Sequence, residues 1–366
     1  MKTLLSICTG ILLASVCPAK TAFDGVWYVA PIWDGARWLN VDMEATPPKV
    51  DVLWEVGGVE PATDVRLSED GKALHFSFPW DYWFMTTPRI LRENLGTFRM
   101  TLRVGGARFD GALQCVPEDK DGKPLDGNRQ YEFPCKRGAP MPPAPDAGAL
   151  KFGDPITLFD GETLNGWRLA TFDGVSKDAL RHMKGWSEGY PKDIFGWNVK
   201  DGLLINTPKL ENVKDGKEPL AFPLPPQFGN IRTDREFEDF RLTLEVRLPK
   251  GGNSGIYLRG RYEVQVTDSF GRPPSAGMIG AVYSRIVPTE NAAKPAGEWQ
   301  TFDITFADRH MTVILNGKKV VDNQPVGGCT GGALDADDSK PGPIYFQGDH
   351  TAVEYRNIKL YPRIKE

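Results

Sequence analysis

Hydrophobic and polar residues alternate in short runs throughout the C-terminal part of the chain. Alternation with a period of two is typical of a β-strand that buries one face. Asn316–Gly317 separates two such runs and predicts a type I′ hairpin turn. Many antiparallel strands of this kind predict two packed sheets, as in a jelly roll. The clearest runs are 240–248, 255–259, 262–266, 301–306, 311–315 and 353–360.

The N-terminal part of the chain shows the same alternation, in runs at 49–54, 73–78 and 97–104. Glycine and aspartate interrupt it about every ten residues, which predicts an antiparallel meander, either a small barrel or a sandwich. The segments 23–28 and 108–113 resemble the two ends of a lipocalin-like barrel. Six of the ten tryptophans fall in this part. We expect them in its core, with a platform for stacking sugars as the alternative.

A proline-rich stretch divides these two patterns. Four prolines fall between Arg137 and Leu150, which predicts an extended, semi-rigid linker. The remaining segment that could form a helix is short, at 175–184. We therefore predict an all-β protein divided into a leader, a small β domain, the linker and a jelly-roll domain, at 1–19, 20–137, 138–150 and 151–366.

The first nineteen residues have the pattern of an export signal. Lys2 precedes an apolar run at 4–16, and the small residues Cys17 and Ala19 precede the expected cleavage site. The run is too short to span a bilayer as a stop-transfer helix. The residues before Cys17 lack the leucine usual in lipoprotein signals. The sequence therefore favours a periplasmic or secreted protein cleaved near Ala19 over lipid anchoring at Cys17.

Cleavage there would leave three cysteines. Cys115 and Cys135 flank a turn-rich stretch, and exported proteins favour disulfides, so a bridge between them is a candidate. Two buried thiols are the alternative. Cys329 lies among four glycines with no histidine nearby in sequence, which argues against a nucleophilic role and leaves it as the lesser alternative.

Composition narrows the classes of function. The 39 glycines and 30 prolines among 366 residues argue against a helical bundle. The net charge of −4 argues against a general binder of nucleic acid or anionic membranes. Hydrophobic residues make up 40% of the chain, which is too rich for disorder. A neutral ligand such as a carbohydrate fits this balance.

An ordered set of strings in the C-terminal part resembles one family, the 3-keto-disaccharide hydrolase domain, over roughly 152–363. The resemblance implies a concanavalin-like jelly roll that acts on glycosides already oxidised to the ketone at C3. Some members are chemically eliminating lyases. The N-terminal part is not covered. The strings are 158–167, 197–204, 237–242, 253–260, 262–266, 297–300, 342–350 and 355–358.

Strand parity suggests where the chemistry lies. In the run 262–266 the apolar side chains share one face, which leaves Glu263 and Gln265 on the other. A retaining glycosidase needs two carboxylates about 5 Å apart, and Gln265 cannot titrate. The pattern therefore favours elimination, in which a base removes the C2 proton that the C3 ketone acidifies and the C1 aglycone leaves.

We predict His350 as the base or proton shuttle, with Glu263 orienting it or serving as the alternate base. Arg259 and Tyr257 share the parity that would place them beside Glu263 on the neighbouring strand. Together with Gln265 they would hold the sugar hydroxyls and the enolate oxygen. A solvated ion pair between Glu263 and Arg259 is the alternative. Further candidates for substrate binding are Asn253, Lys294, Trp299 and Gln347.

These residues predict an exported enzyme that cleaves 3-keto-glycosides, as a lyase or with net hydrolysis. No cofactor is assigned, although His350 and Glu263 together could hold a divalent metal that polarises the ketone. A carbohydrate is the expected partner, with no nucleic acid and no membrane span. The alternatives are a non-catalytic carbohydrate-binding jelly roll and a surface interaction scaffold. The sequence gives no oligomeric state.

Overall fold

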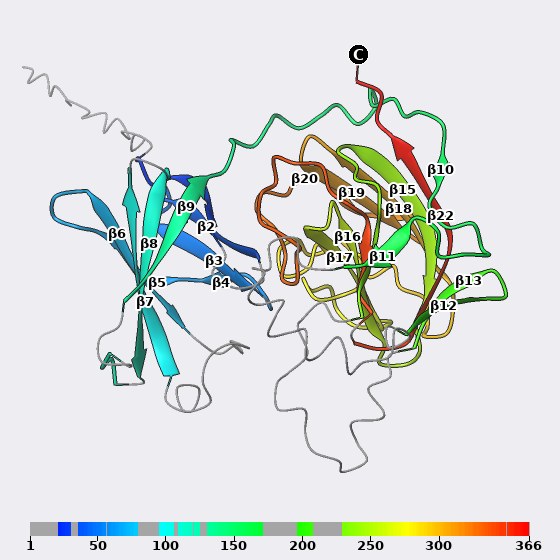
Figure 1. Cartoon of the computed structure of the whole chain (residues 1–366), viewed down its shortest axis with the longest axis horizontal. Helices are drawn as coiled ribbons and strands as arrows, with labels where there is room; N and C mark the ends of the chain where they lie inside the picture. Colours follow the sequence, from blue (N-terminus) through cyan, green and yellow to red (C-terminus); the bar gives the residue numbers. More distant parts are fainter. Residues whose placement is uncertain are drawn as a thin grey trace, which may run out of the picture.

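The computed structural model describes residues 21–30, 36–55, 57–79, 95–105, 109–119, 121–124, 130–170, 196–207, 229–348 and 350–365. In these residues the regular elements are all β-strands, which confirms the all-β prediction. The strands form one nine-stranded sheet from the N-terminal part, and an eight-stranded and a five-stranded sheet from the C-terminal part (Figure 1). The leader 1–19 and the possible helix 175–184 lie outside the described residues.

The nine-stranded sheet is a meander in which nearly every strand pairs with its neighbours in sequence. Its order is β4-β3-β2-β1-β9-β8-β7-β6-β5. The two strands at the ends of this order, β4 and β5, are separated only by Ala62, so the sheet closes into a small barrel. The strands are β1 (Gly25–Val29), β2 (Ala36–Asp42), β3 (Lys49–Glu55), β4 (Glu60–Pro61), β5 (Thr63–Leu67), β6 (Ala73–Pro79), β7 (Leu95–Val104), β8 (Gly111–Asp119) and β9 (Tyr131–Arg137).

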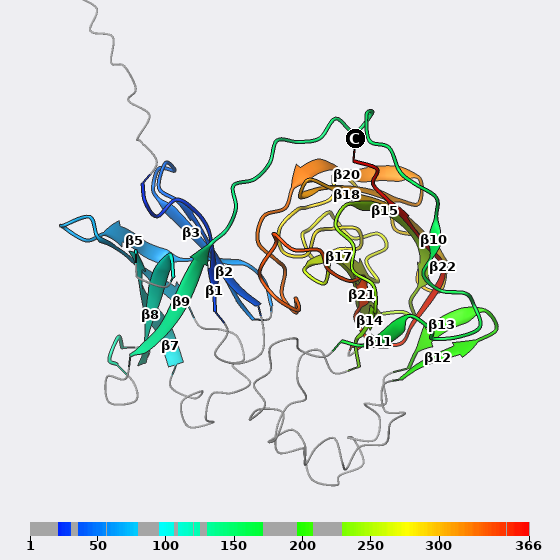
Figure 2. The same ribbon diagram turned by 45° about the horizontal axis from the view of Figure 1, so that its top comes forward.

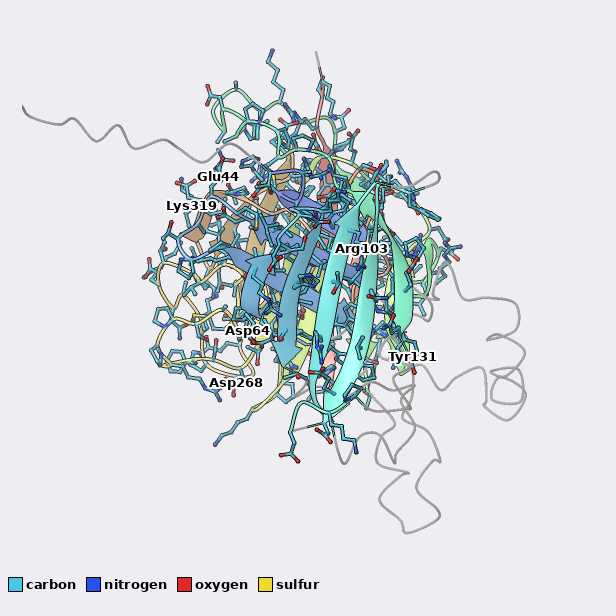
Figure 3. All side chains as sticks on the ribbon, turned by 90° about the vertical axis from the view of Figure 1, so that its left-hand side faces the viewer. Glu44, Asp64, Arg103, Tyr131, Asp268 and Lys319 are labelled. Carbon is cyan, nitrogen blue, oxygen red and sulfur yellow. The ribbon has the colours of Figure 1, made fainter. Side chains whose placement is uncertain are left out.

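Alternating side chains fill the interior of this barrel. On β7, Met100 and Leu102 are buried, whereas Arg103 lies on the outer surface that Figure 3 views. Trp27 and Trp54 belong to the barrel core, which confirms the expectation for these two tryptophans. The buried side chains of the barrel form a hydrophobic core of their own, separate from the core of the sandwich.

The two cysteines of the barrel are free and buried. Cys115 pairs with Tyr131 and Cys135 pairs with Gly111, so the two thiols lie four residues apart along β9. At the strand rise that is about 13 Å, whereas a disulfide needs Cα atoms within about 7 Å of each other. The disulfide candidate is therefore wrong, and the alternative of two buried thiols is the arrangement found. Burial raises the pKa of the Cys135 thiol to about 12.

The C-terminal part is a sandwich of the other two sheets, as predicted. The eight-stranded sheet has the order β12-β13-β22-β15-β18-β19-β20, with β10 also pairing with β22. Its strands are β10 (Ile156–Thr157), β12 (Trp197–Lys200), β13 (Leu203–Asn206), β15 (Phe240–Arg247), β18 (Gln300–Ala307), β19 (His310–Leu315), β20 (Lys318–Pro325) and β22 (Val353–Pro362). The five-stranded sheet has the order β11 (Trp167–Leu169), β14 (Ile231–Thr233), β21 (Tyr345–Phe346), β16 (Asn253–Leu258) and β17 (Tyr262–Thr267).

One hydrophobic core lies between these two sheets. Leu242, Val246 and Ile304 reach it from the eight-stranded sheet, and Val264 and Phe346 reach it from the five-stranded sheet. The hairpin predicted at Asn316–Gly317 joins β19 to β20, and both residues have positive φ, at 52° and 81°, as a type I′ turn requires.

The proline-rich stretch 138–150 forms no strand and runs from β9 towards β10 (Figure 2). Arg309 donates to the carbonyl oxygens of Ala139, at 3.1 Å, and Pro140. Asn323 Nδ2 donates to the carbonyl oxygen of Pro145 at 2.9 Å. Side chains of the sandwich therefore fix the course of the linker.

Candidate active site

A row of polar side chains crosses the five-stranded sheet on the face that points away from the core. Their neighbours in sequence, among them Val264, Ile256 and Phe346, point into the core. Side chains directly opposite one another on paired strands have Cβ atoms about 5 Å apart. The register places Glu263 opposite Tyr257, Tyr257 opposite Tyr345, and Tyr345 opposite Arg232, which in turn faces Arg168. We call this face of the sheet the polar face.

Glu263 and Tyr257 form a hydrogen-bonded pair in this row. Both are buried, with 3% and 1% of their surface exposed. The Tyr257 hydroxyl lies 3.0 Å from Glu263 Oε2 and 2.7 Å from the carbonyl oxygen of Gly331. It has one proton for these two acceptors. The parity argument from the sequence therefore placed Tyr257 correctly beside Glu263.

A glycine makes room for the carboxyl group. Gly255 lies opposite Gln265 on the polar face, and a Cβ atom at this position would overlap Glu263 Oε1. The Glu263 side chain thus extends over the Gly255 backbone, where any larger residue would displace it. This contact explains why β16 carries a glycine within a strand, where glycine is otherwise unfavourable.

Amide side chains surround the pair on the same face. Gln265 Oε1 accepts the N–H of Val266 at 2.8 Å. Asn230 donates to the Tyr345 hydroxyl at 2.6 Å and accepts the N–H of Gly348 at 2.6 Å. The Oε1 atom of Gln347 is buried and has no hydrogen-bond partner within the described part of the chain. A buried acceptor without a donor costs free energy, so a ligand hydroxyl would stabilise it.

His350 lies at one end of this face. It is exposed and precedes Thr351, whose Oγ1 accepts the N–H of Asn253 at 2.7 Å. Asn253 and Tyr257 are four residues apart on β16, about 13 Å at the strand rise. The structure therefore brings His350 and Asn253 to the same sheet as Glu263, but to a position farther along it.

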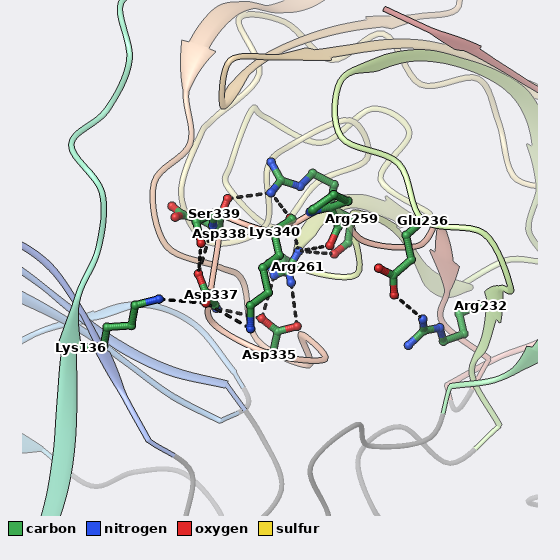
Figure 4. A network of polar contacts seen from close by, with 11 residues as sticks. Lys136, Arg232, Glu236, Arg259, Arg261, Asp335, Asp337, Asp338, Ser339 and Lys340 are labelled. Carbon is green, nitrogen blue, oxygen red and sulfur yellow. Dashed lines mark hydrogen bonds and ion pairs between the residues drawn. The ribbon is translucent and has the colours of Figure 1, made fainter. Parts of the chain in front are cut away.

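Arg259 does not share the polar face, in contrast to the sequence prediction. Strand β16 ends at Leu258, and Arg259 adopts a left-handed conformation with φ of 53°, which breaks the strand parity. Its buried guanidinium donates to the carbonyl oxygens of Asp338, at 2.7 Å, and Lys340 (Figure 4). Burial lowers the pKa of this guanidinium. The contacts of Arg259 thus hold a loop of the fold.

Lys294 and Trp299 lie against the other sheet. Lys294 Nζ donates to the carbonyl oxygen of Trp299 at 3.0 Å. The guanidinium groups of Arg247 on β15 and Arg356 on β22 lie 4.7 and 4.0 Å from the centre of the Trp299 ring. These strands belong to the eight-stranded sheet, so the structure does not bring Lys294 and Trp299 to the polar face.

Two residues of the polar face, Arg232 and Tyr345, are not among the candidates predicted from the sequence. Arg232 is 2% exposed and forms an ion pair with Glu236 at 3.0 Å (Figure 4). The ring of Tyr345 stacks on that of Tyr257, with centroids 4.3 Å apart. Strands β14 and β21 have only three and two residues, which is too short for alternation to be visible in the sequence. The one signal in the sequence is that Arg232 lies between an isoleucine and a threonine, two residue types that favour strands.

No group of three or more histidine, cysteine, aspartate or glutamate side chains in the described ranges is arranged to hold a metal ion. In the same ranges, no helix is both long and apolar enough to cross a bilayer.

The chain is similar in sequence and structure to several known proteins. A curated 3-keto-disaccharide hydrolase of Bacteroides thetaiotaomicron is 26% identical over 171 residues, covering 39% of this chain and 49% of that protein. The chain thus spans about half the length of the curated relative that it matches. A solved structure of a candidate glycosyl hydrolase from Parabacteroides distasonis is 25% identical, with a TM-score of 0.40 over 68% of this chain and all of that one.

A second solved structure from Parabacteroides distasonis, also described as a candidate glycosyl hydrolase, is 21% identical with a TM-score of 0.40, over 57% of this chain and 93% of that one. The model of one family matches residues 154–361, more than half of the chain, which include the whole polar face. The family resemblance found in the sequence is thereby confirmed. The chain belongs to the 3-keto-alpha-glucoside-1,2-lyase-like domain family.

Proposed function

We propose that the protein is an exported enzyme that cleaves 3-keto-glycosides by removing the C2 proton and eliminating the C1 aglycone. The observation that carries this proposal is the buried Glu263–Tyr257 pair on the polar face of a domain of this family. A neutral sugar calls for hydrogen-bonding groups and one base, and the polar face offers both.

Glu263 is the base in this proposal. A general base must lie within hydrogen-bond reach of the proton that it removes, and Glu263 is the carboxylate that the polar face holds beside Tyr257. Its Oε atom takes the C2 proton, and the electron pair of the C2–H bond moves to form an enolate with the charge on the C3 oxygen. The enolate then collapses to a C1–C2 double bond as the C1–O bond breaks. The leaving oxygen takes a proton, and later addition of water to the double bond gives net hydrolysis.

Gln265 supplies a donor for the enolate oxygen. It lies two residues from Glu263 on the same face of β17, and its Nε2 group is a donor of the kind that stabilises a developing negative charge. Gln347 Oε1, a buried acceptor that no described residue satisfies, suits a hydroxyl of the sugar. His350, at the end of the sheet, is the candidate for protonating the leaving oxygen. Arg232 lies three strands away from Glu263, about 14 Å at the usual strand spacing, where it would contact a second sugar unit.

The mechanism is tested with a 3-keto-glucoside of a chromogenic phenol that carries deuterium at C2. Elimination breaks the C2–H bond, so we expect phenol release from the deuterated substrate to be slower by a primary isotope effect. The matched glucoside without the ketone should release none. Phenol release at equal rates from the two isotopologues would overturn elimination in favour of direct attack at C1, and a chelator added to a parallel reaction reports any metal requirement.

The alternative of a non-catalytic carbohydrate-binding domain predicts a different outcome. The protein would then release no phenol from the keto-glucoside, and it would be retained on a glycan affinity gel. Export is proposed from the leader pattern alone. Sequencing of the mature N-terminus after expression with the leader tests it, since cleavage near Ala19 is expected and an intact Met1 would contradict export.

A further inference from the structure

The glycine-rich segment around Cys329 lies between the two domains. On one side of residues 327–333, which we call the strap, is the barrel. The indole Nε1–H of Trp38 on β2 donates to the carbonyl oxygen of Cys329 at 2.8 Å. The Trp38 ring packs on Gly328, where a Cβ atom would come within 2.6 Å of it. Gly331 touches Gly57 of the barrel so closely that a Cβ atom at position 331 would overlap the Gly57 carbonyl oxygen.

The other side of the strap faces the candidate active site. The hydroxyl of Thr330 accepts the N–H of Glu263 at 2.9 Å and donates to the carbonyl oxygen of Arg261 at 3.1 Å. The carbonyl oxygen of Gly331 accepts the hydroxyl of Tyr257. The strap therefore contacts both members of the Glu263–Tyr257 pair. Its backbone contacts the side chain of Tyr257, and the side chain of Thr330 contacts the backbone of Glu263.

The strap is thin because both neighbours approach its backbone. At Gly328 and Gly331 the absence of a side chain lets Trp38 and Gly57 of the barrel come into contact with the main chain of the strap. This close approach accounts for the glycines that the sequence left unassigned. Cys329 is fully buried in the interface, and burial raises the pKa of its thiol, so it packs there as a small apolar residue.

Further contacts hold the two domains together around the strap. Tyr28 of the barrel donates to Asp338, which also forms an ion pair with Arg309 at 2.9 Å. The backbone N–H of Val59 donates to the hydroxyl of Ser284 at 2.9 Å. An apolar cluster drawn from both domains lies between these contacts and comprises Tyr28, Ala36, Trp38, Leu53, Cys329, Ala333 and Ala336. The interface therefore has a packed core of its own.

We propose that the barrel is a positioning element of the active site, which holds the strap against β16 and β17 so that Thr330 and Gly331 fix Glu263 and Tyr257 in their reactive arrangement. This inference rests on the proposed function for its kinetic readout. Trp38 is the central positioning residue on the barrel side, because it contacts two residues of the strap and no residue of the polar face that we have described.

The test compares two tryptophans of the full-length protein. Trp38→Phe removes the donor to Cys329, and Trp38→Ala also removes the ring from Gly328. Trp27→Phe is the matched control, because the Trp27 indole donates to the carbonyl oxygen of Phe23 at 2.7 Å inside the barrel. We expect Trp38→Ala to lower kcat by about 10- to 100-fold, with KM within about twofold of the wild-type value, and Trp27→Phe to leave both unchanged.

A double-mutant cycle shows whether the effect passes through the strap. Where the effect passes through Gly331, Trp38→Ala should have a smaller effect on kcat in the Tyr257→Phe background, because that contact is already lost, while the contact of Thr330 with Glu263 remains. Strictly additive effects would overturn the part of the inference that runs through Gly331, and an equal loss of kcat in Trp27→Phe would overturn the inference as a whole. Retained kcat in a folded Trp38→Ala protein would overturn it as well.

A second measurement does not depend on catalysis. The amide of Glu263 donates to Thr330, so release of the strap should speed its hydrogen exchange. We expect faster exchange at Glu263 in both Trp38 variants than in the wild type and in Trp27→Phe. Unchanged exchange would overturn the positioning role even if the enzyme is active. Faster exchange in a protein that releases no phenol would instead uphold the positioning role and reject the proposed function.

Discussion

The two sheets of the sandwich carry glutamates in very different surroundings. Glu245 on β15 of the eight-stranded sheet accepts hydrogen bonds from Arg356 at 2.8 Å and from Asn357 at 2.5 Å, near the solvent. Glu263 on the five-stranded sheet is buried, and the neutral hydroxyl of Tyr257 is among its contacts. The Arg356 hydrogen bond lowers the pKa of Glu245, so this carboxylate is a weak base. Glutamate thus forms an ion pair on one sheet and is the candidate base on the other.

The difference between the sheets also extends to their aromatic residues. Trp299 lies beside two arginines and supports a surface ion-pair network. Tyr257 and Tyr345 stack on each other and present hydroxyl groups to neighbouring polar groups. Burial, rather than the presence of polar or aromatic residues, distinguishes a candidate site from a solvated surface in this protein.

The largest effect that separates the two sheets is expected from removing the charge of each glutamate. Glu263→Gln should lower kcat by roughly 10³-fold, within the range for a general base, whereas Glu245→Gln should change it by less than about twofold. Initial rates of phenol release from a 3-keto-glucoside measure both. Activity of Glu263→Gln near that of the wild type would move the role of base to another residue, and a combined variant with His350→Ala would then identify it.

A smaller effect is expected from a methyl group placed beside the carboxylate. Gly255→Ala would push Glu263 Oε1 aside and should lower kcat by about 10- to 100-fold. Gly317→Ala on the other sheet is the control. Gly317 has φ of 81° and open space around it, so alanine there should cost about 1 kcal/mol of stability and leave kcat unchanged. Thermal unfolding and kinetics on the same samples separate the two effects, and equal kinetics for both variants would refute the steric argument.

The smallest effect concerns stability and pH. Because its folded-state pKa is lowered, Glu245 contributes stability above its ordinary pKa of 4.5 and loses that contribution as the pH falls. The pair is partly exposed, so Glu245→Gln should cost about 0.5 kcal/mol at pH 7 and almost nothing at pH 3. Urea unfolding at the two pH values measures this difference. A loss of equal size at pH 3 would show that packing, rather than charge, makes the contribution.

Strand parity made most of the fold and part of the site predictable from the sequence. Glu263, Gln265 and Tyr257 lie on one face because β16 and β17 are long enough for alternation to show. Parity failed for Arg259, where a left-handed residue ends the strand. It could say nothing of Arg232 or Tyr345, which lie on very short strands. The contacts of the strap could not be predicted either, because Trp38 and Glu263 are distant from it in sequence and meet it only in the tertiary fold.

The fixed linker bears on how the barrel stays in place. Arg309 and Asn323 hold its backbone along the sandwich, so the barrel meets the strap as part of the same chain and at a high effective concentration. Barrel and sandwich produced as separate chains would lose this concentration effect and would associate through the contacts of the interface alone.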